Sequence, residues 1–388
     1  MRVVLNAVAA KMGGALSYIR NFLSTLAATD RENEYTVFAQ SSLVGELSGL
    51  APNIHIEAEP MAERGEMGRV VFDQWLLRRF LKRWDADCLF STANFGVVWP
   101  GVPQIVSVRN PIYYCRRYYE HVREIEGRAA AARVSIRRRM VNLSMRSSDV
   151  VVTPSAAMRD MLLEWNAVAA RKCVVIHHGF DREKFLSMQG EPSGQLKEQV
   201  ARRGTETILF YPSLYAKHKN FDTMVKGLDI LARRGLDFRV LFVCKIDPAA
   251  SPYERRTWEL IEKLKVGRYI TMLGNQPYRN MPAIYRAADL VVWPTFAESF
   301  GHPLIETMAC GKAAVASDIA VNREMLADAG LYFETFNAED FAAKVEAALD
   351  KATAARLVAA GEKRVNDFSW KKHVASFVDL FAKSSGAN

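Results

Sequence analysis

The chain has 388 residues, too many for one ordinary hydrophobic core, and this length favours two domains. Its composition, 49% hydrophobic and 24% charged with a net charge of +9, excludes a disordered chain. A membrane span needs about 18 uninterrupted apolar residues, and no stretch of the sequence approaches that length. Residues 2–5 have the length of a strand, not of a secretory signal. The five cysteines lack CxxC spacing, which favours reduced thiols in a cytoplasmic protein.

The first half of the chain alternates predicted strands with helical segments, which predicts a parallel sheet with helices on both faces. The predicted strands span residues 3–5, 35–39, 88–91, 104–108, 149–153 and 173–176. Gly13 and Gly14 lie between the first strand and a helix with an apolar stripe. Such a pair can let a phosphate approach the backbone, although two loop glycines are more often only a turn.

Two short patterns look like metal ligands but do not predict a metal site. Asp85 and Asp87 stand ahead of a short strand, where two solvated loop acids are the better interpretation. His177 and His178 are neighbours in a strand, so their side chains point to opposite faces. The sequence therefore predicts no bound metal.

Residues 116–146 contain nine arginines and three glutamates, a net charge of +6 out of the chain's +9. Ile136, Met140 and Leu143 lie at helical spacing among these arginines, and residues 70–84 combine apolar and basic residues in the same way. Such helices can lie on an anionic bilayer or hold a pyrophosphate-bearing acceptor. The alternative is that the apolar side chains pack inward and the arginines are only solvated. The concentration of charge favours membrane or lipid-linked acceptor contact, and nucleic acid is disfavoured because no recognition motif accompanies the charge.

A second domain is predicted beyond residues 186–205, a polar segment that has the composition of a linker. Further strands are predicted at residues 207–211, 238–244, 269–273, 290–293 and 313–317. These strands predict a second parallel sheet.

The segment 289–311 predicts a buried strand, a tight turn and a helix that begins near Pro303. A helix that opens from a turn containing Gly301 presents free N–H groups and a partial positive charge, which suit a phosphate. Glu298 precedes the turn and Glu306 lies one turn into the helix. Carboxyl ends of parallel strands bind ligands, but two solvated acids on a surface loop remain the alternative.

The segment ESFGHPLIETMACGKAAVAS, from Glu298 to residue 317, resembles the donor-site signature of family 4 of the retaining glycosyltransferases. The flanking sequences LGNQPY (273–278), IYRAAD (284–289) and GLYF (330–333) agree with it, as do residues 147–155 and 175–185. The resemblance covers most of the chain and is strongest at residues 207–333. It implies the α/β GT-B fold, in which two doubly wound Rossmann-like domains face each other across a cleft.

The resemblance also implies a domain organisation. Residues 1–188 would form the acceptor-side domain and residues 206–367 the nucleotide-sugar domain. The segment 368–388 would be a terminal helix that packs back on the first domain, with Val374, Phe377 and Phe381 in helical register.

Most of the predicted site residues bind the donor in the resembled family. Lys219, followed by Asn220, would hold the diphosphate, which Gly13 and Gly14 would contact from the first domain. Glu298 would contact the transferred sugar and would be catalytic together with Lys219, and Glu306 would hold the ribose hydroxyls. The remaining donor residues are Asn275 at the base and Phe300, Gly301 and His302 at the helix start.

The chain departs from the family pattern at two places. Ser213 and Leu214 stand where the family has an arginine, which makes Lys217 the nearest substitute for its charge. Arg109 stands where the family often has a histidine, followed by Asn110 on the acceptor side. An arginine cannot act as a base but can hold an anionic or hydroxylated substrate, and an ordinary surface arginine is the equal alternative.

The implied activity is transfer of a sugar from a nucleotide diphosphate sugar to a hydroxyl, with retention at the anomeric carbon. The resemblance implies that the transfer needs no metal and no cofactor, with the nucleotide sugar as co-substrate. No second carboxylate is evident in the first domain, so same-face attack is favoured over double displacement. The expected acceptor is a saccharide or a lipid-linked molecule of a cell-surface polysaccharide or glycolipid. The expected location is the cytoplasm, with peripheral contact at the inner membrane face as an open alternative. A nucleotide-sugar epimerase of the same fold and a non-catalytic nucleotide-sugar-binding protein are the alternatives.

Overall fold

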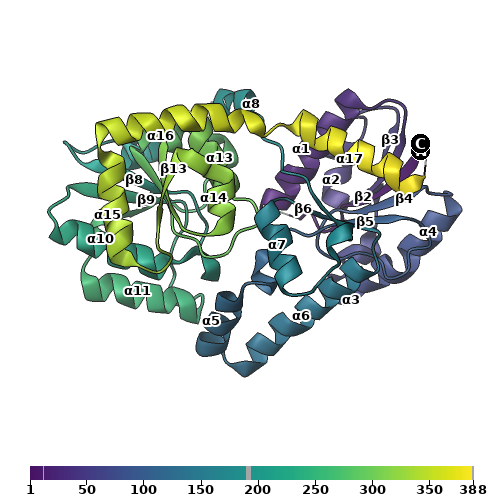
Figure 1. Ribbon diagram of the computed structural model, residues 1–388, viewed down its shortest axis with the longest axis horizontal. Helices are drawn as coiled ribbons and strands as arrows, with labels where there is room; N and C mark the ends of the chain where they lie inside the picture. The colour runs from purple at the N-terminus through teal and green to yellow at the C-terminus, as the bar shows by residue number, and fades with distance from the viewer. Residues whose placement is uncertain (12, 189–193, 387–388) are drawn as a thin grey trace. The chain divides into compact units, whose positions relative to one another are not determined.

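The computed structural model describes residues 1–11, 13–188 and 194–386, and the chain divides into two compact units (Figure 1). The first unit comprises Met1–Tyr114, Ala132–Gly179 and Phe368–Asn388. The second comprises Cys115–Ala131 and Phe180–Asp367. Cys115–Ala131, which the sequence placed in the acceptor-side domain, thus belongs to the second unit, and the arginine-rich segment is divided between the two.

The first unit contains a seven-stranded parallel sheet in the order β3-β2-β1-β4-β5-β6-β7. On β1, Val4 pairs with Thr36 on one side and with Leu89 on the other. The strands are β1 (Arg2–Asn6), β2 (Glu34–Ala39), β3 (Ile54–Ala58), β4 (Cys88–Ser91), β5 (Gln104–Ser107), β6 (Val150–Thr153) and β7 (Cys173–Val175).

The helices of the first unit cover both faces of this sheet. Val3 and Leu5 belong to the core cluster formed with α1 and α17, whereas Val4 belongs to the cluster on the opposite face with α4. The helices are α1 (Gly13–Thr29), α2 (Ser41–Leu47), η1 (Pro60–Glu63), α3 (Gly65–Val71), η2 (Phe72–Leu76), α4 (Leu77–Arg83), η3 (Pro111–Tyr113), α6 (Arg128–Arg146, continuing from the second unit), α7 (Ala156–Glu164), η4 (Ala170–Lys172) and α17 (Trp370–Ser385).

The C-terminal helix α17 packs beside α1, as the first unit in Figure 1 shows. Phe377 is fully buried, with its ring centre 4.6 Å from that of Phe90 and 5.5 Å from that of Phe22. The start of α17 needs a glycine opposite it, because a Cβ on Gly179 would lie 2.4 Å from the Cα of Trp370. Aromatic packing and one close backbone approach therefore hold the end of the chain on the first unit.

The second unit contains a six-stranded parallel sheet in the order β10-β9-β8-β11-β12-β13. The connections run outward from β8 in one direction and then restart at β11 on its other side, where Leu290 pairs with Leu209. This reversal is the topological switch point at which such sheets bind ligands. The strands are β8 (Thr207–Tyr211), β9 (Phe238–Phe242), β10 (Ile270–Met272), β11 (Leu290–Trp293), β12 (Ala313–Ser317) and β13 (Gly330–Phe333).

The helices of the second unit flank this sheet, and one of them comes from Cys115–Ala131, far ahead of the rest of the unit in the sequence. That helix, α5, is attached through the hydroxyl of Tyr253 in α11, which donates to the carbonyl of His121 over 3.1 Å. The helices are α5 (Arg116–Glu126), α8 (Arg182–Ser187), α9 (Gly194–Val200), η5 (Lys217–Lys219), α10 (Phe221–Arg233), α11 (Pro252–Leu264), η6 (Gly267–Tyr269), η7 (Tyr278–Asn280), α12 (Met281–Ala287), α13 (His302–Ala309), α14 (Ala320–Leu326), η8 (Ala327–Ala329), α15 (Ala338–Leu349), α16 (Lys351–Arg364) and η9 (Val365–Asp367).

The fold class predicted from the sequence is confirmed, because each unit is a doubly wound parallel sheet. Two edge strands, β3 and β13, were not predicted, and the predicted strand at 238–244 ends two residues earlier, at Phe242. None of the helices in the described part of the chain has the length and hydropathy needed to cross a bilayer.

Replacing Phe377 by alanine is expected to lower the free energy of unfolding by about 3–5 kcal/mol, because a large buried ring is lost and leaves a cavity. Urea-induced unfolding measures the effect. Lys372→Ala, on the exposed side of the same helix, is the control and is expected to change stability by less than about 0.5 kcal/mol. Equal stability of Phe377→Ala and the wild type would show that α17 does not stabilise the first unit.

Candidate functional site

The predicted strand, turn and helix at residues 289–311 are present as β11, a loop and α13. Gly301 precedes the first residue of α13 with φ 81° and ψ 56°, a left-handed conformation that favours glycine. His302 begins the helix and Pro303 lies in its first turn. The N-terminal amides of α13 therefore lie just beyond the carboxyl end of β11, next to the switch point.

Lys219 and Glu298 form an ion pair at this edge of the sheet. The ammonium of Lys219 lies 2.5 Å from Oε1 of Glu298, and both side chains are largely buried, with 15% and 13% of their surface exposed. Oγ1 of Thr295 lies 3.2 Å from the same carboxylate oxygen, and Nζ of Lys219 lies 4.5 Å from the ring centre of Trp293. The arrangement places one cation and one carboxylate, both sheltered from water, within reach of a common ligand.

The topology of the sheet brings the two charges together, although they are 79 residues apart. Lys219 ends the loop that follows β8, and Glu298 lies in the loop that follows the adjacent strand β11. The two loops are joined at the carbonyl of His218, which accepts the N–H of Phe296 and the hydroxyl of Thr295, each over 3.0 Å. Burial and the neighbouring Lys219 lower the pKa of His218 to about 4, so this imidazole adds no charge to the pair at neutral pH.

Glu306 is buried on α13, with only 6% of its surface exposed. Tyr278 donates its hydroxyl to Oε1 over 2.9 Å and Tyr285 donates to Oε2 over 2.8 Å. Burial raises the pKa of Glu306, while the two phenol hydrogen bonds lower it. An ionised carboxylate has about four acceptor positions, so the tyrosines leave about two for other donors.

Sequence reasoning missed the roles of Tyr278 and Tyr285. Both lie in segments that it quoted, LGNQPY and IYRAAD, on either side of the start of α12. The available signal was one tyrosine in each of these two segments, close in sequence to the helix that carries Glu306. A buried carboxylate needs hydrogen-bond donors, and a tyrosine hydroxyl can supply one.

The other predicted donor residues occupy different environments. Phe300 is 2% exposed and its ring centre lies 5.0 Å from that of His302, so it supports the turn from within the core. Asn275 follows β10 and the left-handed Gly274. Lys217 is paired with Glu126 of α5 and lies over the ring of Tyr253. The structure therefore does not bring Lys217 into the group formed by Lys219 and Glu298.

The predicted residues of the first unit lie at the carboxyl ends of β1 and β5. Gly13 begins α1, and a Cβ on the following Gly14 would meet no atom within 4 Å, so the space around it is open. Arg109 is half-buried: it donates to the carbonyl of Thr92 over 2.5 Å, and its guanidinium lies 4.3 Å from the ring centre of Tyr18. Of the two interpretations given above, the geometry disfavours an ordinary solvated arginine.

Asn110 has a structural role in the loop after β5. Its side chain accepts the N–H of Ile112 over 3.2 Å and thereby caps η3. Within residues 1–11, 13–188 and 194–386, no three His, Cys, Asp or Glu side chains gather in a way that could hold a metal ion. All five cysteines are free thiols.

Two protein-family models match this chain. The model described as Glycosyltransferase Family 4 matches residues 12–184, and the one described as Glycosyl transferases group 1 matches residues 193–364. D-inositol 3-phosphate glycosyltransferase of Corynebacterium aurimucosum is 25% identical over 242 residues, 61% of this chain and 57% of that protein. O-antigen chain mannosyltransferase B of Escherichia coli is 30% identical over 125 residues, 32% of this chain and 33% of that protein. The matches thus span less than two thirds of either relative's length.

Solved structures share the fold over nearly the whole chain. Sucrose-phosphate synthase from Thermosynechococcus elongatus superimposes with a TM-score of 0.76 at 19% identity, covering 100% of both chains. HepE from Anabaena in complex with UDP and glucose gives a TM-score of 0.69 at 16% identity, covering 99% of this chain and 100% of that one. At such low identity these likenesses show the fold alone.

The raised pKa of Glu306 predicts a pH-dependent stability. The folded protein binds this proton more tightly than the unfolded chain, so the stability contributed by Glu306 is complete below its unfolded pKa and is lost as pH rises through its folded pKa. Relative to the wild type, the melting temperature of Glu306→Gln, which cannot ionise, is therefore expected to rise as the pH increases above the ordinary glutamate pKa of about 4.3. Exposed Glu262→Gln is the control. A difference between Glu306→Gln and wild type that does not change with pH would contradict the buried, ionisable state.

Proposed function

Because the chain belongs to the glycosyltransferases of family 4 and group 1, we propose that it moves a sugar from a nucleotide diphosphate sugar to a hydroxyl, with retention at the anomeric carbon. The observation that carries this proposal is the sheltered pair of Lys219 and Glu298 beside the switch point of the second sheet, with buried Glu306 on the adjoining helix. A cation for a diphosphate and carboxylates for sugar hydroxyls are the groups that such a donor requires.

Donor binding is assigned to the second unit. Glu306 accepts two ribose hydroxyls at the positions that Tyr278 and Tyr285 leave free. The backbone after Gly274, at Asn275, borders the base, and the amides at the start of α13 receive the diphosphate. Lys219 is the cation of this group, and it must exchange its contact with Glu298 for the diphosphate when the donor binds.

This exchange releases Glu298 to bind the transferred sugar. Its carboxylate is then paired with sugar hydroxyls instead of an ammonium, and Oγ1 of Thr295 stays beside Oε1. The pair thus keeps two charges satisfied before the donor arrives, which avoids an unpaired buried charge in the free enzyme.

The transfer step proceeds on one face of the sugar. The bond between the anomeric carbon and the diphosphate oxygen breaks, and its electron pair stays on that oxygen. The acceptor hydroxyl bonds to the anomeric carbon from the same side and gives its proton to the departing phosphate oxygen. Lys219 and the α13 amides stabilise the negative charge that grows there, so this proposal needs no metal ion.

The first unit is assigned to the acceptor. Arg109 supplies a fixed cation for an anionic or hydroxylated acceptor. Gly13 and Gly14 keep the donor role expected for them, and the open space at Gly14 suits a phosphate that approaches the start of α1. The curated relatives include proteins named for an inositol phosphate and for an O-antigen chain. The O-antigen name supports the saccharide acceptor that we propose here.

A surface of the first unit supports peripheral membrane contact. Large apolar side chains are exposed on it, Trp75 to 66% and Trp99 to 80%. The surface joins α3, η2 and α6, because Arg137 on α6 pairs with Glu66 on α3 over 2.8 Å and Val98 beside Trp99 donates to Gln74 over 2.9 Å. The exposed large apolar side chains of these segments are Met67, Val70, Val71, Trp75, Trp99, Ile136, Met140 and Leu143.

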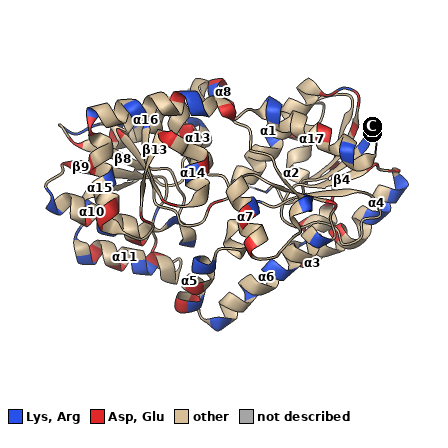
Figure 2. Cartoon of the chain, viewed as in Figure 1, with Lys and Arg blue, Asp and Glu red and all other residues tan. Residues whose placement is uncertain are grey.

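Basic residues lie on the same helix as three of these exposed apolar side chains. Along α6 there are arginines and no acidic residue, as Figure 2 shows. The stripe of Ile136, Met140 and Leu143 is exposed and does not pack inward. Exposed apolar side chains among cations suit the headgroup region of an anionic bilayer, which would place the protein at the cytoplasmic membrane face. Phe80 and Trp84, which the sequence grouped with these residues, instead pack on Phe38.

Replacing Lys219 by methionine is expected to lower kcat/KM by about 10²–10³-fold, because the charge that stabilises the leaving diphosphate is lost. A thermal-shift screen of nucleotide sugars identifies the donor first, since a ligand above its Kd raises Tm. Transfer is then measured with that donor. Lys263→Met, on the exposed side of α11, is the matched control. Activity of Lys219→Met within about twofold of wild type would contradict the assignment.

Replacing Ile136, Met140 and Leu143 together by serine is expected to weaken binding to vesicles of phosphatidylcholine and phosphatidylglycerol by at least about tenfold, because buried apolar area is lost. Co-sedimentation measures the bound fraction, which should also fall with added salt. Leu214→Ser, an exposed leucine of the second unit, is the control. Absence of vesicle binding by the wild type, or an equal loss with Leu214→Ser, would refute the membrane surface.

A further inference from the structure

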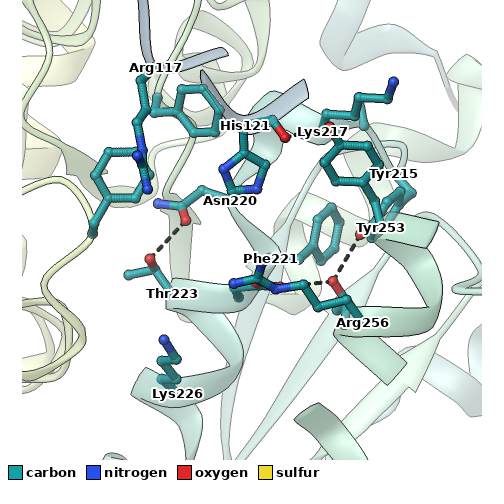
Figure 3. A pocket seen from close by; sticks show the side chains of 15 residues that line it. Arg117, His121, Tyr215, Lys217, Asn220, Phe221, Thr223, Lys226, Tyr253 and Arg256 are labelled. Carbon is teal, nitrogen blue, oxygen red and sulfur yellow. Dashed lines mark hydrogen bonds and ion pairs between the residues drawn. The ribbon is translucent and has the colours of Figure 1, made fainter. Parts of the chain in front are cut away.

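A cavity of about 150 Å³, whose lining does not include Lys219, Glu298 or Glu306, lies within the second unit. Its floor is the N-terminal part of α10 and its walls come from α5, from α11 and from the loops after β8, β11 and β13. Figure 3 shows Arg117, His121, Asn220 and Arg256 arranged around this space. The connection to the donor-binding residues is the loop after β8, which carries Lys217 to the cavity and Lys219 to Glu298.

Basic side chains outnumber acidic ones in the lining of the cavity. Four basic side chains line it against one carboxylate, that of Asp222. Asp222 pairs with Nε of Arg256 over 2.9 Å and accepts the hydroxyl of Thr257 over 3.0 Å, which leaves the two terminal nitrogens of the guanidinium for another acceptor. The basic side chains are Arg117, Lys217, Lys226 and Arg256.

Three of the four cations have a carboxylate partner. Lys217 pairs with Glu126, and Arg117 lies 3.4 Å from Glu120. Within the described part of the chain, no ion pair is recorded for Lys226, which is exposed at the rim. The field in the cavity also acts on His121, where burial and the charges of Arg117 and Arg256 lower the pKa of the imidazole.

Aromatic rings hold the shape of the cavity. Tyr215 and Phe221 stack with ring centres 4.7 Å apart, and the Phe296 and Phe336 rings lie 5.3 Å apart. The His121 ring stacks on Tyr253, and its Nδ1 is buried with no hydrogen-bond partner among the described residues. A cavity held by packed rings needs little rearrangement to accept a ligand.

We propose that this cavity binds the phosphate group of a small ligand, at a site distinct from the one that holds the donor diphosphate. Guanidinium groups from two different helices offer forked donors that match phosphate oxygens, and Lys226 adds a point charge at the rim. The volume admits a phosphate with a few further atoms, and the aromatic walls would contact the carbon atoms attached to it. The phosphate belongs either to a phosphate monoester or to free inorganic phosphate.

Calorimetric titration of the full chain with inorganic phosphate and with glycerol 3-phosphate, at constant ionic strength, tests this site. Saturable binding is expected, and Arg256→Gln should weaken it at least about tenfold, because charge-assisted hydrogen bonds are lost. Lys226→Gln, which breaks no recorded ion pair, should also weaken it and guards against a folding defect in Arg256→Gln. Arg255→Gln, the neighbouring exposed arginine on α11 that does not line the cavity, should leave binding unchanged.

Lys219→Met separates this site from the donor site, since it removes the cation that pairs with Glu298, and Lys219 is not itself one of the residues that line the cavity. Retained phosphate binding in this variant supports the proposal. Tighter binding of glycerol 3-phosphate than of phosphate identifies a monoester ligand, and equal binding identifies free phosphate. No saturable binding of either probe up to about 10 mM would overturn the proposal. So would loss of binding in Lys219→Met, or an equal effect of Arg255→Gln and Arg256→Gln.

Discussion

The pairing of Lys219 with Glu298 constrains the whole edge of the second sheet. Two largely buried charges are tolerated only if each has the other as partner, because an uncompensated charge away from water is strongly destabilising. The pair therefore requires β8 and β11 to be neighbours, their loops to be joined at the His218 carbonyl, and Trp293 to lie beneath the ammonium. The same pair gives the site its proposed chemistry. A diphosphate can replace Glu298 as the partner of Lys219, and sugar hydroxyls can replace Lys219 as the partner of Glu298.

Glu306 solves the same problem without a cation. Two phenol hydroxyls donate hydrogen bonds to its oxygens. Burial raises the pKa of Glu306 and so favours the protonated form. The two glutamates of one motif thus differ in kind: Glu298 is held by charge and Glu306 by neutral hydrogen bonds. The neutral environment of Glu306 suits a residue that accepts hydrogen bonds from ribose hydroxyls. The ion pair of Glu298 suits a residue that must change partners during the reaction.

Positive charge is concentrated in two places that serve different ligands. On the first unit, the arginines of α6 flank exposed apolar side chains, a combination that fits a lipid surface. On the second unit, Arg117 and Arg256 line a small cavity with aromatic walls, which fits a compact anion. The arginine-rich segment is one run in the sequence, but its first part, through Ala131, belongs to the second unit and the remainder to the first. Its charge therefore serves two surfaces.

The sequence by itself determined the alternation of strands and helices, the fold class and the motif that contains Glu298 and Glu306, because periodicity, turn residues and spacing are local properties. It did not determine β3 and β13, which lie at sheet edges and are recognised by their pairing. Only the tertiary structure decided that Lys219 meets Glu298, that Lys217 pairs with Glu126, and that Tyr278 and Tyr285 hold Glu306. These contacts join residues up to 91 positions apart. Which of many charged residues become neighbours is fixed by strand order and helix packing, and neither is written in any short stretch of sequence.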